Sequence, residues 1–377
     1  MIAHETGSGE SAILYSETDV QSAVEAGAIT SEAAVALRTH VASLHAMPAV
    51  DEEHFRLITG FNDIFVTIAC LLVVFAAAAV GTSLSAAPLG GMFVAAAAWV
   101  MAEAFTRRRR MALPSIVLML AFVLGLGTAA YSGLEQAMPK HAVVISYDYN
   151  GQTERWTTQK HYLWQTSLML LAGAAAAGLG ALLHWRRFRV AITIAAAAGA
   201  LAICVIAVVG ALREETLGDN VFVAPAALVC GLAVFVYAMR WDLSDRARTT
   251  QRSDIAFWLH LVAAPLIAHP LFLWMGVTRG TGIGVATAIG VLAIYLAFAV
   301  VALAIDRRAL LVSALAYVLI ALAQLFRSYG AVELNVALTA LIIGSALLAL
   351  SAWWHAIRRR LVGLLSPGLR TRLPPVG

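Results

Sequence analysis

Residues 253–274, SDIAFWLHLVAAPLIAHPLFLW, place an acid, two histidines and two prolines in a stretch that is apolar enough to cross a membrane. An ionisable side chain at the centre of a bilayer costs about 2.5–3.5 kcal/mol on insertion scales, so such groups usually face protein or water. Each proline frees a backbone carbonyl about one turn earlier in the helix. The stretch therefore predicts either a waypoint for an ion or proton, or a packing kink whose histidines bond to neighbouring helices.

The spacing of these residues assigns them to two faces of the helix. At ~100° per residue, Asp254, Trp258, Pro265 and His269 fall within about 60° of one another, and His260 points almost the opposite way. The two histidines lie about 13.5 Å apart along an ideal helix, which excludes a two-histidine metal site on this helix alone. We expect the face of Asp254 and His269 to point into the bundle, near Asp63. His260 should find a different partner or an interfacial position near the cytoplasmic side.

Polar residues of other spans add candidates for the same path. Gln324 shares a stripe with Tyr317, and Arg327 and Glu333 are expected to pair across a tight turn, as a structural clamp or a substrate clamp. The residues predicted to line a path or hold a ligand are Asp63, Asp254, His260, His269, Gln324, Arg327 and Glu333. No catalytic residue, metal site or cofactor is predicted, since the chain contains no GxxxxGK[ST], GxSxG or HExxH motif.

The composition is that of a membrane protein. The chain is 61% hydrophobic and only 13% charged, whereas soluble domains are about a quarter charged. Because a spanning helix needs ~20 mostly apolar residues, we predict an all-α integral membrane protein with about ten transmembrane helices. Their expected ranges are 62–82, 88–106, 112–134, 163–184, 190–212, 221–240, 255–276, 282–305, 309–327 and 333–355.

The distribution of basic residues predicts the orientation of these helices. With the N-terminus inside, eighteen arginines fall in the inner segments, including Arg107–Arg110, Arg307 and Arg308, and six basic residues fall in the outer ones. Basic residues favour short cytoplasmic loops, so both termini are predicted to be cytoplasmic. Glu103 is expected to neutralise the first basic cluster. His184 and His355, beside other basic clusters, are expected to contact lipid headgroups.

Three regions follow from this pattern: an acidic cytoplasmic leader at 1–60, a transmembrane domain at 61–360 and a cytoplasmic tail at 361–377. The leader carries nine acids and two arginines. Two short amphipathic helices are predicted in it, the first capped at Ser16 and stopped at Gly27, the second capped at Thr30. They either pack at the inner membrane face or bind a cytoplasmic protein partner through residues 1–50. Nucleic acid is not an expected partner.

The longest outer segment, near 135–161, is predicted to form a β-hairpin. Asn150-Gly151 is a strong two-residue turn signal between VVISYDY and ERWTTQKHY. His141 and His161 lie near its open end, where they would either hold a surface metal ion or simply cap the outer face.

The first four and last four spans resemble each other, which predicts a parallel duplication of helices 1–4 and 7–10. The alignment pairs Asp63 with Asp254, and it pairs Gly173 and His184 with Gly344 and His355 at the same separation. Chance similarity between Ala- and Leu-rich helices is the alternative. In transporters built from repeats, the site lies at the interface between the repeats.

The leader pattern AGAITSEAAVAL, followed by many apolar spans, resembles uncharacterised bacterial polytopic inner-membrane proteins with a short N-terminal GxITxExA helical pair. The resemblance covers the leader and the general layout. It implies a bacterial inner-membrane location and supplies no catalytic residues.

Three functions are compatible with these features. The first is a transporter or channel-like permease for an ion or small molecule, with its path between the two repeats. The second is a non-transporting sensor or assembly scaffold whose leader binds a cytoplasmic partner. The third is an intramembrane enzyme or haem protein that uses His260 or His269; a non-enzymatic function is favoured over it.

Overall fold

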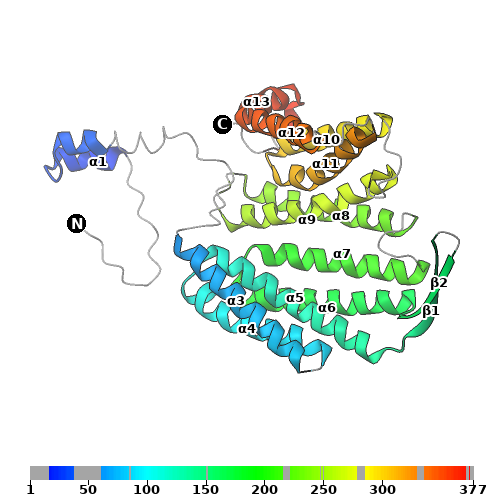
Figure 1. Cartoon of the computed structure of the whole chain (residues 1–377). Helices are drawn as coiled ribbons and strands as arrows, with labels where there is room; N and C mark the ends of the chain where they lie inside the picture. Colours follow the sequence, from blue (N-terminus) through cyan, green and yellow to red (C-terminus); the bar gives the residue numbers. More distant parts are fainter. Residues whose placement is uncertain are drawn as a thin grey trace. The chain divides into compact units, whose positions relative to one another are not determined.

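The computed structural model describes residues 17–37, 61–84, 86–149, 152–214, 221–246, 248, 250–277, 285–328, 335–370 and 373. By its internal contacts the chain divides into two units, Met1–His54 with Gly377, and Phe55–Val376. Figure 1 traces the elements of both units.

Eight helices among the described residues are long and apolar enough to cross a membrane, as predicted for an all-α membrane protein. Each begins and ends within a few residues of the expected range. They are α3 (Phe61–Ser83), α4 (Ala87–Ala102, continued by the π-helix η1 at Glu103–Arg108), α5 (Ala112–Ala137), α6 (Leu163–Phe188), α7 (Ile192–Arg213), α8 (Val223–Ser244), α9 (Gln251–Trp274) and α10 (Val285–Ile305).

Four further helices follow among the described residues of the C-terminal part of the chain. The helices α11 (Ala309–Ser328) and α12 (Asn335–Ala352) occupy the ninth and tenth predicted positions. The tenth was expected to continue to residue 355, but α12 ends at Ala352 and a separate helix, α13 (Trp354–Leu364), follows. The predicted boundary between membrane domain and tail at residue 360 therefore falls inside α13. A one-turn helix, α14 (Pro367–Arg370), comes after it.

The helices of this unit pack mostly against their neighbours in sequence, and α9 is the main exception. The helices α3, α4 and α5 contact one another, and α5, α6 and α7 follow in order (Figure 1). The helix α9 packs against α7, α8 and α11, so it joins the N-terminal helices to the C-terminal ones. Half of its most apolar window is buried, more than in any of the other seven spans. Such a position lets α9 carry polar side chains that face protein.

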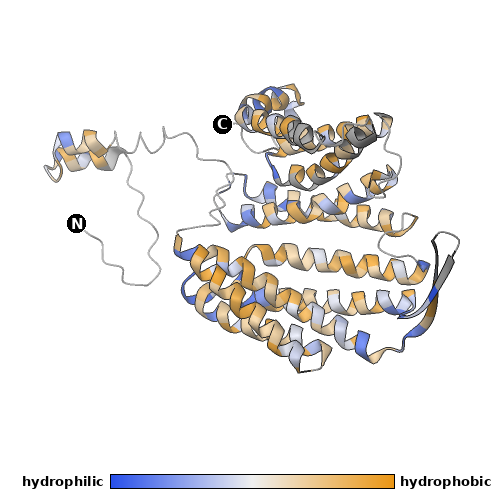
Figure 2. Cartoon of the chain, viewed as in Figure 1, coloured by the Kyte–Doolittle hydropathy of each residue, from blue (hydrophilic) through white to orange (hydrophobic). Residues whose placement is uncertain are grey.

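The connections that carry the predicted inner basic clusters lie together at one end of the unit, which we call the basic end. The Nε and Nη2 of Arg187, in the last turn of α6, donate to the two carboxylate oxygens of Glu103 at 2.7 and 3.0 Å. Arg107 also pairs with Glu103, at 3.2 Å. The predicted role of Glu103 is thus confirmed. The side chain of Gln251, at the start of α9, donates to the carbonyl of Arg189. Figure 2 shows hydrophilic residues at this end and apolar residues along the helices.

The predicted hairpin is present at the opposite end, between α5 and α6. Strands β1 (His141–Tyr149) and β2 (Gln152–Lys160) pair antiparallel, with His141 opposite Lys160 and Tyr149 opposite Gln152. The Asn150-Gly151 turn lies outside the described residues. The His141 ring stacks on Tyr162, with centroids 4.0 Å apart. Among the described residues, no group of three or more His, Cys, Asp and Glu side chains could hold a metal ion.

The leader contains the two expected helices, α1 (Glu17–Glu25) and a second at residues 31–37. Gly27 has a φ of 69°, in the left-handed region that favours glycine after a helix. The Thr30 hydroxyl accepts the backbone N–H of Ala33 at 3.1 Å, so the predicted cap of the second helix is confirmed. The proposed cap at Ser16 lies outside the described residues.

Candidate functional site

The helix α9 runs without interruption from Gln251 to Trp274 through both prolines. Thr250 caps it, with its hydroxyl accepting the amide of Arg252 at 3.3 Å. Proline has no N–H, so Pro265 and Pro270 leave the carbonyls of Leu261 and Leu266 without the usual helical donor. In a packed bundle such carbonyls can be satisfied by neighbouring side chains or water.

His260 lies at the centre of a buried group of charged residues at the basic end. Its Nε2 is 2.8 Å from Oδ2 of Asp242, near the end of α8. The other oxygen of Asp242 accepts from Nη2 of Arg307, in the α10–α11 connection. Arg307 also donates to the carbonyl and the hydroxyl of Ser253, at 3.2 and 3.0 Å. His260 is fully buried and Arg307 is 1% exposed, so this contact excludes water.

Asp306 organises a second set of buried contacts directly beside the first. Its Oδ2 is 3.0 Å from Nη1 of Arg248, and its Oδ1 accepts the indole N–H of Trp354 at 2.7 Å. Nε of Arg358, on α13, lies 3.5 Å from Oδ1. Asp306 has a φ of 57°, a left-handed conformation that aspartate adopts more readily than most residues. This residue therefore ties the α8–α9 connection and α13 to the end of α10.

We call these residues the buried charge cluster: Asp242, Arg248, His260, Asp306, Arg307 and Arg358. Removing charges from water is costly, and the cost is recovered only when the ions are paired and hydrogen-bonded. Here each carboxylate bonds to groups from at least two other segments, and the guanidinium of Arg307 bonds to two. The cluster therefore fixes α8, α9, α13 and the α10–α11 connection relative to one another at the basic end.

The Asp242–His260 pair is not arranged for nucleophilic catalysis. Nδ1 of His260 has no hydrogen-bond partner among the described residues, and the ring is fully buried. The ring of Phe235 packs against it at 5.2 Å between centroids. A general base must reach both a nucleophile and a substrate. The geometry therefore favours a closed structural contact over a hydrolytic site.

His269 lies further along α9 and borders a cavity. Its Nδ1 is 2.8 Å from the hydroxyl of Tyr317 on α11, and the Tyr317 ring stacks on Phe272 at 4.6 Å. The cavity measures about 220 Å³. Its wall comes from α7, α8 and α9: Ile206, Val223, Ala224, Ala227, Pro265, Leu266, His269, Pro270 and Leu273.

The face of α9 that was predicted to point into the bundle is only partly buried. Asp254, Trp258 and His269 are partly buried, but Pro265 is exposed, so the expectation that the whole stripe faces the bundle interior is wrong. The most buried residues of the helix, such as Leu259, His260 and Ala263, lie on the other side. The reason is that the Asp242 side chain reaches His260 from α8 and is itself paired with Arg307 of the α10–α11 connection. His260 does find a different partner, as expected.

The other candidates are placed as follows. Asp63 is 4% exposed in the first turn of α3, where its carbonyl accepts from the Thr67 hydroxyl at 2.6 Å. Trp258 of α9 packs against the cluster of buried side chains that includes Val66 and Cys70 of α3. No contact that brings Asp63 and His269 together is seen in the described part of the chain. The side chains of Gln324 and Arg327 and the whole of Glu333 lie outside the described residues, so their roles stay predictions.

His184 is not at a headgroup position, which corrects the expectation for this residue. It is fully buried on α6, with Nδ1 3.4 Å from the Thr193 hydroxyl and the rings of Trp99, Phe122 and Phe188 around it. His355, its partner in the proposed repeat, is exposed. The duplication stays a prediction, but these two matched histidines do not share an environment.

Sequence reasoning missed Asp242, Asp306 and Arg307 as a group. Asp242 was treated as part of the loop before α9, although α8 extends to Ser244. Arg307 was counted only as an inner-loop charge. The available signal was the pair Asp306-Arg307 directly after an apolar span, because an acid beside a basic residue at a helix end often forms part of an ion-pair network.

Comparison of the chain with protein-family models, with curated proteins and with solved structures found no match.

Proposed function

We propose that this protein is a bacterial inner-membrane permease for a small ion or molecule, with α9 lining its path. In this proposal the chain has ten spans and both termini are cytoplasmic, so the basic end faces the cytoplasm. The observation that carries the proposal is the cavity at His269, because it places an ionisable side chain beside open space between three membrane-spanning helices.

The walls of this cavity are suited to hold water or a hydrated ion. A buried water needs at least two polar partners, and an apolar cavity of this size would stay dry. His269 supplies a ring nitrogen, since only Nδ1 is engaged by Tyr317. The carbonyl of Leu266 lacks the amide donor that Pro270 would otherwise provide, and both residues line the cavity. These two groups support a polar binding site for water or a hydrated ion in the outer half of α9.

The buried charge cluster is the proposed inner gate. His260, the member of the cluster on α9, lies about 13.5 Å from His269 along the helix axis. In this proposal the ion pairs of the cluster close the basic end. The gate would open when one ion pair separates and water hydrates its two charged groups. Asp254, in the first turn of α9, is half-buried beside the cluster and is the proposed entry residue from the cytoplasm.

A flux measurement tests this proposal. We expect liposomes that contain the full-length protein to dissipate an imposed proton, sodium or potassium gradient faster than empty liposomes. The His269→Phe variant should lower this rate by roughly tenfold or more, since about 1.4 kcal/mol added to a barrier slows a step tenfold. His355→Phe, at an exposed position on α13, is the matched control and should retain the wild-type rate.

A second variant separates transport from stability. His269→Phe leaves the Tyr317 hydroxyl without its partner, which costs about 1–3 kcal/mol if that hydroxyl stays unpaired. Adding Tyr317→Phe should restore stability but not flux. Wild-type liposomes no faster than empty ones, together with no stabilisation by any member of a broad panel of small solutes, would count against a permease. Recovery of flux in the double variant would mean that His269 has a structural role and no role in transport.

The leader supports a second candidate function, that of a scaffold or sensor. Its helices belong to a unit separate from the membrane helices, and Leu37 at the end of the second helix is 45% exposed. As this second function, we propose that the acidic leader binds a cytoplasmic protein partner.

Deletion of residues 1–50 tests the scaffold function. We expect cross-linking in intact membranes to recover a cytoplasmic protein with the full chain and to lose it with the deletion variant. The membrane helices should keep their thermal stability, measured by tryptophan fluorescence. Recovery of the same proteins by both chains would show that the leader is not the binding element.

A further inference from the structure

The basic end also carries a group of arginines that do not belong to the buried charge cluster. They come from two segments: residues 103–111, which join α4 to α5, and residues 185–191, which end α6 and lead into α7. The two segments contain seven arginines and a single acid, Glu103. We call these arginines the arginine patch: Arg107, Arg108, Arg109, Arg110, Arg186, Arg187 and Arg189.

The carboxylate of Glu103 holds the two segments side by side. One of its oxygens accepts from Nε of Arg187 at 2.7 Å, and the other is 3.2 Å from Nη1 of Arg107. The juxtaposition does not rest on these ion pairs alone, because Phe105 and Phe188 of the two segments pack against the same cluster of buried apolar side chains. Seven arginines against one acid leave the two segments with a formal charge of +6.

Most guanidinium groups of the patch remain available to an anion. Among the side chains that the structure describes, none forms a hydrogen bond or an ion pair with these five exposed residues: Arg108, Arg109, Arg110, Arg186 and Arg189. The guanidinium of Arg109 lies 5.7 Å from the centre of the Phe105 ring, a contact that leaves its N–H donors unused. Arginine binds phosphate well because its planar fork of donors matches two phosphate oxygens.

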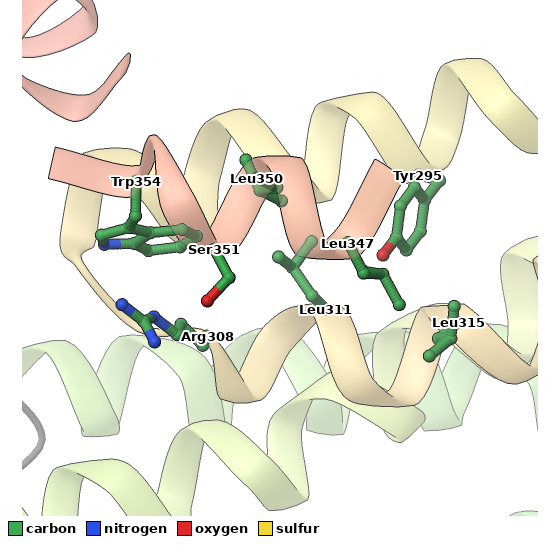
Figure 3. A pocket seen from close by; sticks show the side chains of 8 residues that line it. All are labelled: Tyr295, Arg308, Leu311, Leu315, Leu347, Leu350, Ser351 and Trp354. Carbon is green, nitrogen blue, oxygen red and sulfur yellow. The ribbon is translucent and has the colours of Figure 1, made fainter. Parts of the chain in front are cut away.

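Arg308 differs from the patch arginines in this respect. It stands at one end of a cavity of about 190 Å³, separated by leucines from Tyr295 at the other end (Figure 3). Its guanidinium lies over the Trp354 ring, 4.9 Å from the centroid, and it has a further interaction within the protein. The protein itself therefore engages Arg308, whereas the five patch arginines are left to a ligand.

The arginine patch lies where two membrane-spanning helices end. The apolar span that includes α4 ends at Arg108, and the span of α6 ends at Phe188. Trp185 directly precedes the second group of arginines, and tryptophan is enriched at the boundary between hydrocarbon and headgroups. Arginine clusters in this position attract anionic lipid headgroups, and each basic residue adds to the affinity. The ligand that fits the patch is therefore an anionic lipid.

We propose that the arginine patch binds one lipid that carries two phosphates, diphosphatidylglycerol, from the surrounding bilayer. One phosphate would contact the arginines at 108–110, and the other would contact Arg186 and Arg189. The headgroup would thus bridge the two segments that Glu103 holds together. Once the first phosphate is bound, the second is held at a high effective concentration, which favours this lipid over one with a single phosphate. The lipid site does not depend on transport by the protein.

Native mass spectrometry of the full-length protein tests this site. The protein would be released from micelles that contain diphosphatidylglycerol and phosphatidylglycerol in equal amounts. We expect one diphosphatidylglycerol to be retained with a preference of about fivefold, the contribution of one additional charge contact. Arg108→Gln combined with Arg186→Gln removes one charge from each segment and should abolish the preference. Arg240→Gln combined with Arg360→Gln removes two exposed charges outside the patch and should leave it unchanged.

Two results would overturn the proposal: no preference in the wild type, or equal losses of preference in the two glutamine pairs, which would mean that general surface charge attracts the lipid. Displacement of the lipid by a tenfold excess of inorganic pyrophosphate would also overturn it, because the site would then take a soluble diphosphate. Arg108→Lys combined with Arg186→Lys keeps both charges and should keep most of the preference. The Arg108→Gln and Arg186→Gln pair should melt at the wild-type temperature, since neither side chain bonds to the described protein.

Discussion

Replacing Asp242 by asparagine is expected to lower the free energy of unfolding by about 3–5 kcal/mol, the cost of leaving a buried charge without its counterion. Asparagine keeps the size of the side chain and can still accept a hydrogen bond from His260. It cannot neutralise Arg307, which is 1% exposed and donates to both carboxylate oxygens of Asp242. The measurement is unfolding of the purified protein in mixed micelles at increasing dodecyl sulfate, followed by tryptophan fluorescence.

A double variant and a surface control test whether the unpaired charge of Arg307 causes the loss of stability. Adding Arg307→Met to Asp242→Asn removes both buried charges, and we expect it to recover most of the lost stability, because apolar replacements of buried ion pairs are often neutral. Glu135→Gln makes the same chemical change in an exposed pair with Lys140, 3.5 Å apart, and should cost no more than about 1 kcal/mol. If the single and double variants were equally unstable, the Asp242–Arg307 pair would not be the source of the effect.

The same variants bear on the proposed gate. If the buried charge cluster closes the basic end, the double variant should be stable and yet leak ions faster than the wild type in the flux assay. A stable double variant with unchanged flux would leave the cluster a purely structural feature. Stability and closure are thus separable by measuring both quantities on one protein.

The helices were predictable because their signal is strong and local. Unbroken apolar stretches of about 20 residues set α3 to α10 within a few residues. The hairpin was equally local, since an Asn-Gly turn and two β-rich stretches define it. The break at Trp353 was not predicted, because α12 and α13 join through a single residue and the apolar pattern continues across it.

The contacts between polar residues were not predictable in the same way. His260 was placed correctly on a separate face of its helix. Its partner Asp242 is 18 positions away in the chain, and Arg307, which pairs with Asp242, is 47 positions away from His260. Nothing in the local pattern indicates which acid or arginine reaches a given histidine. His184 illustrates the same limit: a basic cluster beside it suggested an interface, whereas aromatic rings from α4, α5 and α6 enclose it.

The α4–α5 packing provides the second large expected effect. The backbones of these helices approach closely at Gly91 and Gly125, as small residues allow in membrane bundles. A Cβ added at Gly125 would lie 2.7 Å from the carbonyl oxygen of Gly91 and 2.8 Å from the backbone nitrogen of Ala95. Both are backbone atoms, which can move away only if the helices separate.

Gly125→Ala is therefore expected to destabilise the protein by about 1–3 kcal/mol through overpacking, despite the better helix propensity of alanine. Gly133→Ala on the same helix is the matched control, because a Cβ there would meet only the Pro88 side chain, at an ordinary 3.7 Å. That variant should be neutral or stabilising by up to about 1 kcal/mol, since glycine is the poorer helix former. The opposite signs make the comparison decisive: thermal melting in detergent should rank Gly133→Ala at or above the wild type and Gly125→Ala below it. Equal melting temperatures for the two variants would mean that α4 and α5 do not approach as closely at Gly91 and Gly125 as described here, and that their spacing is set by larger side chains elsewhere along the pair.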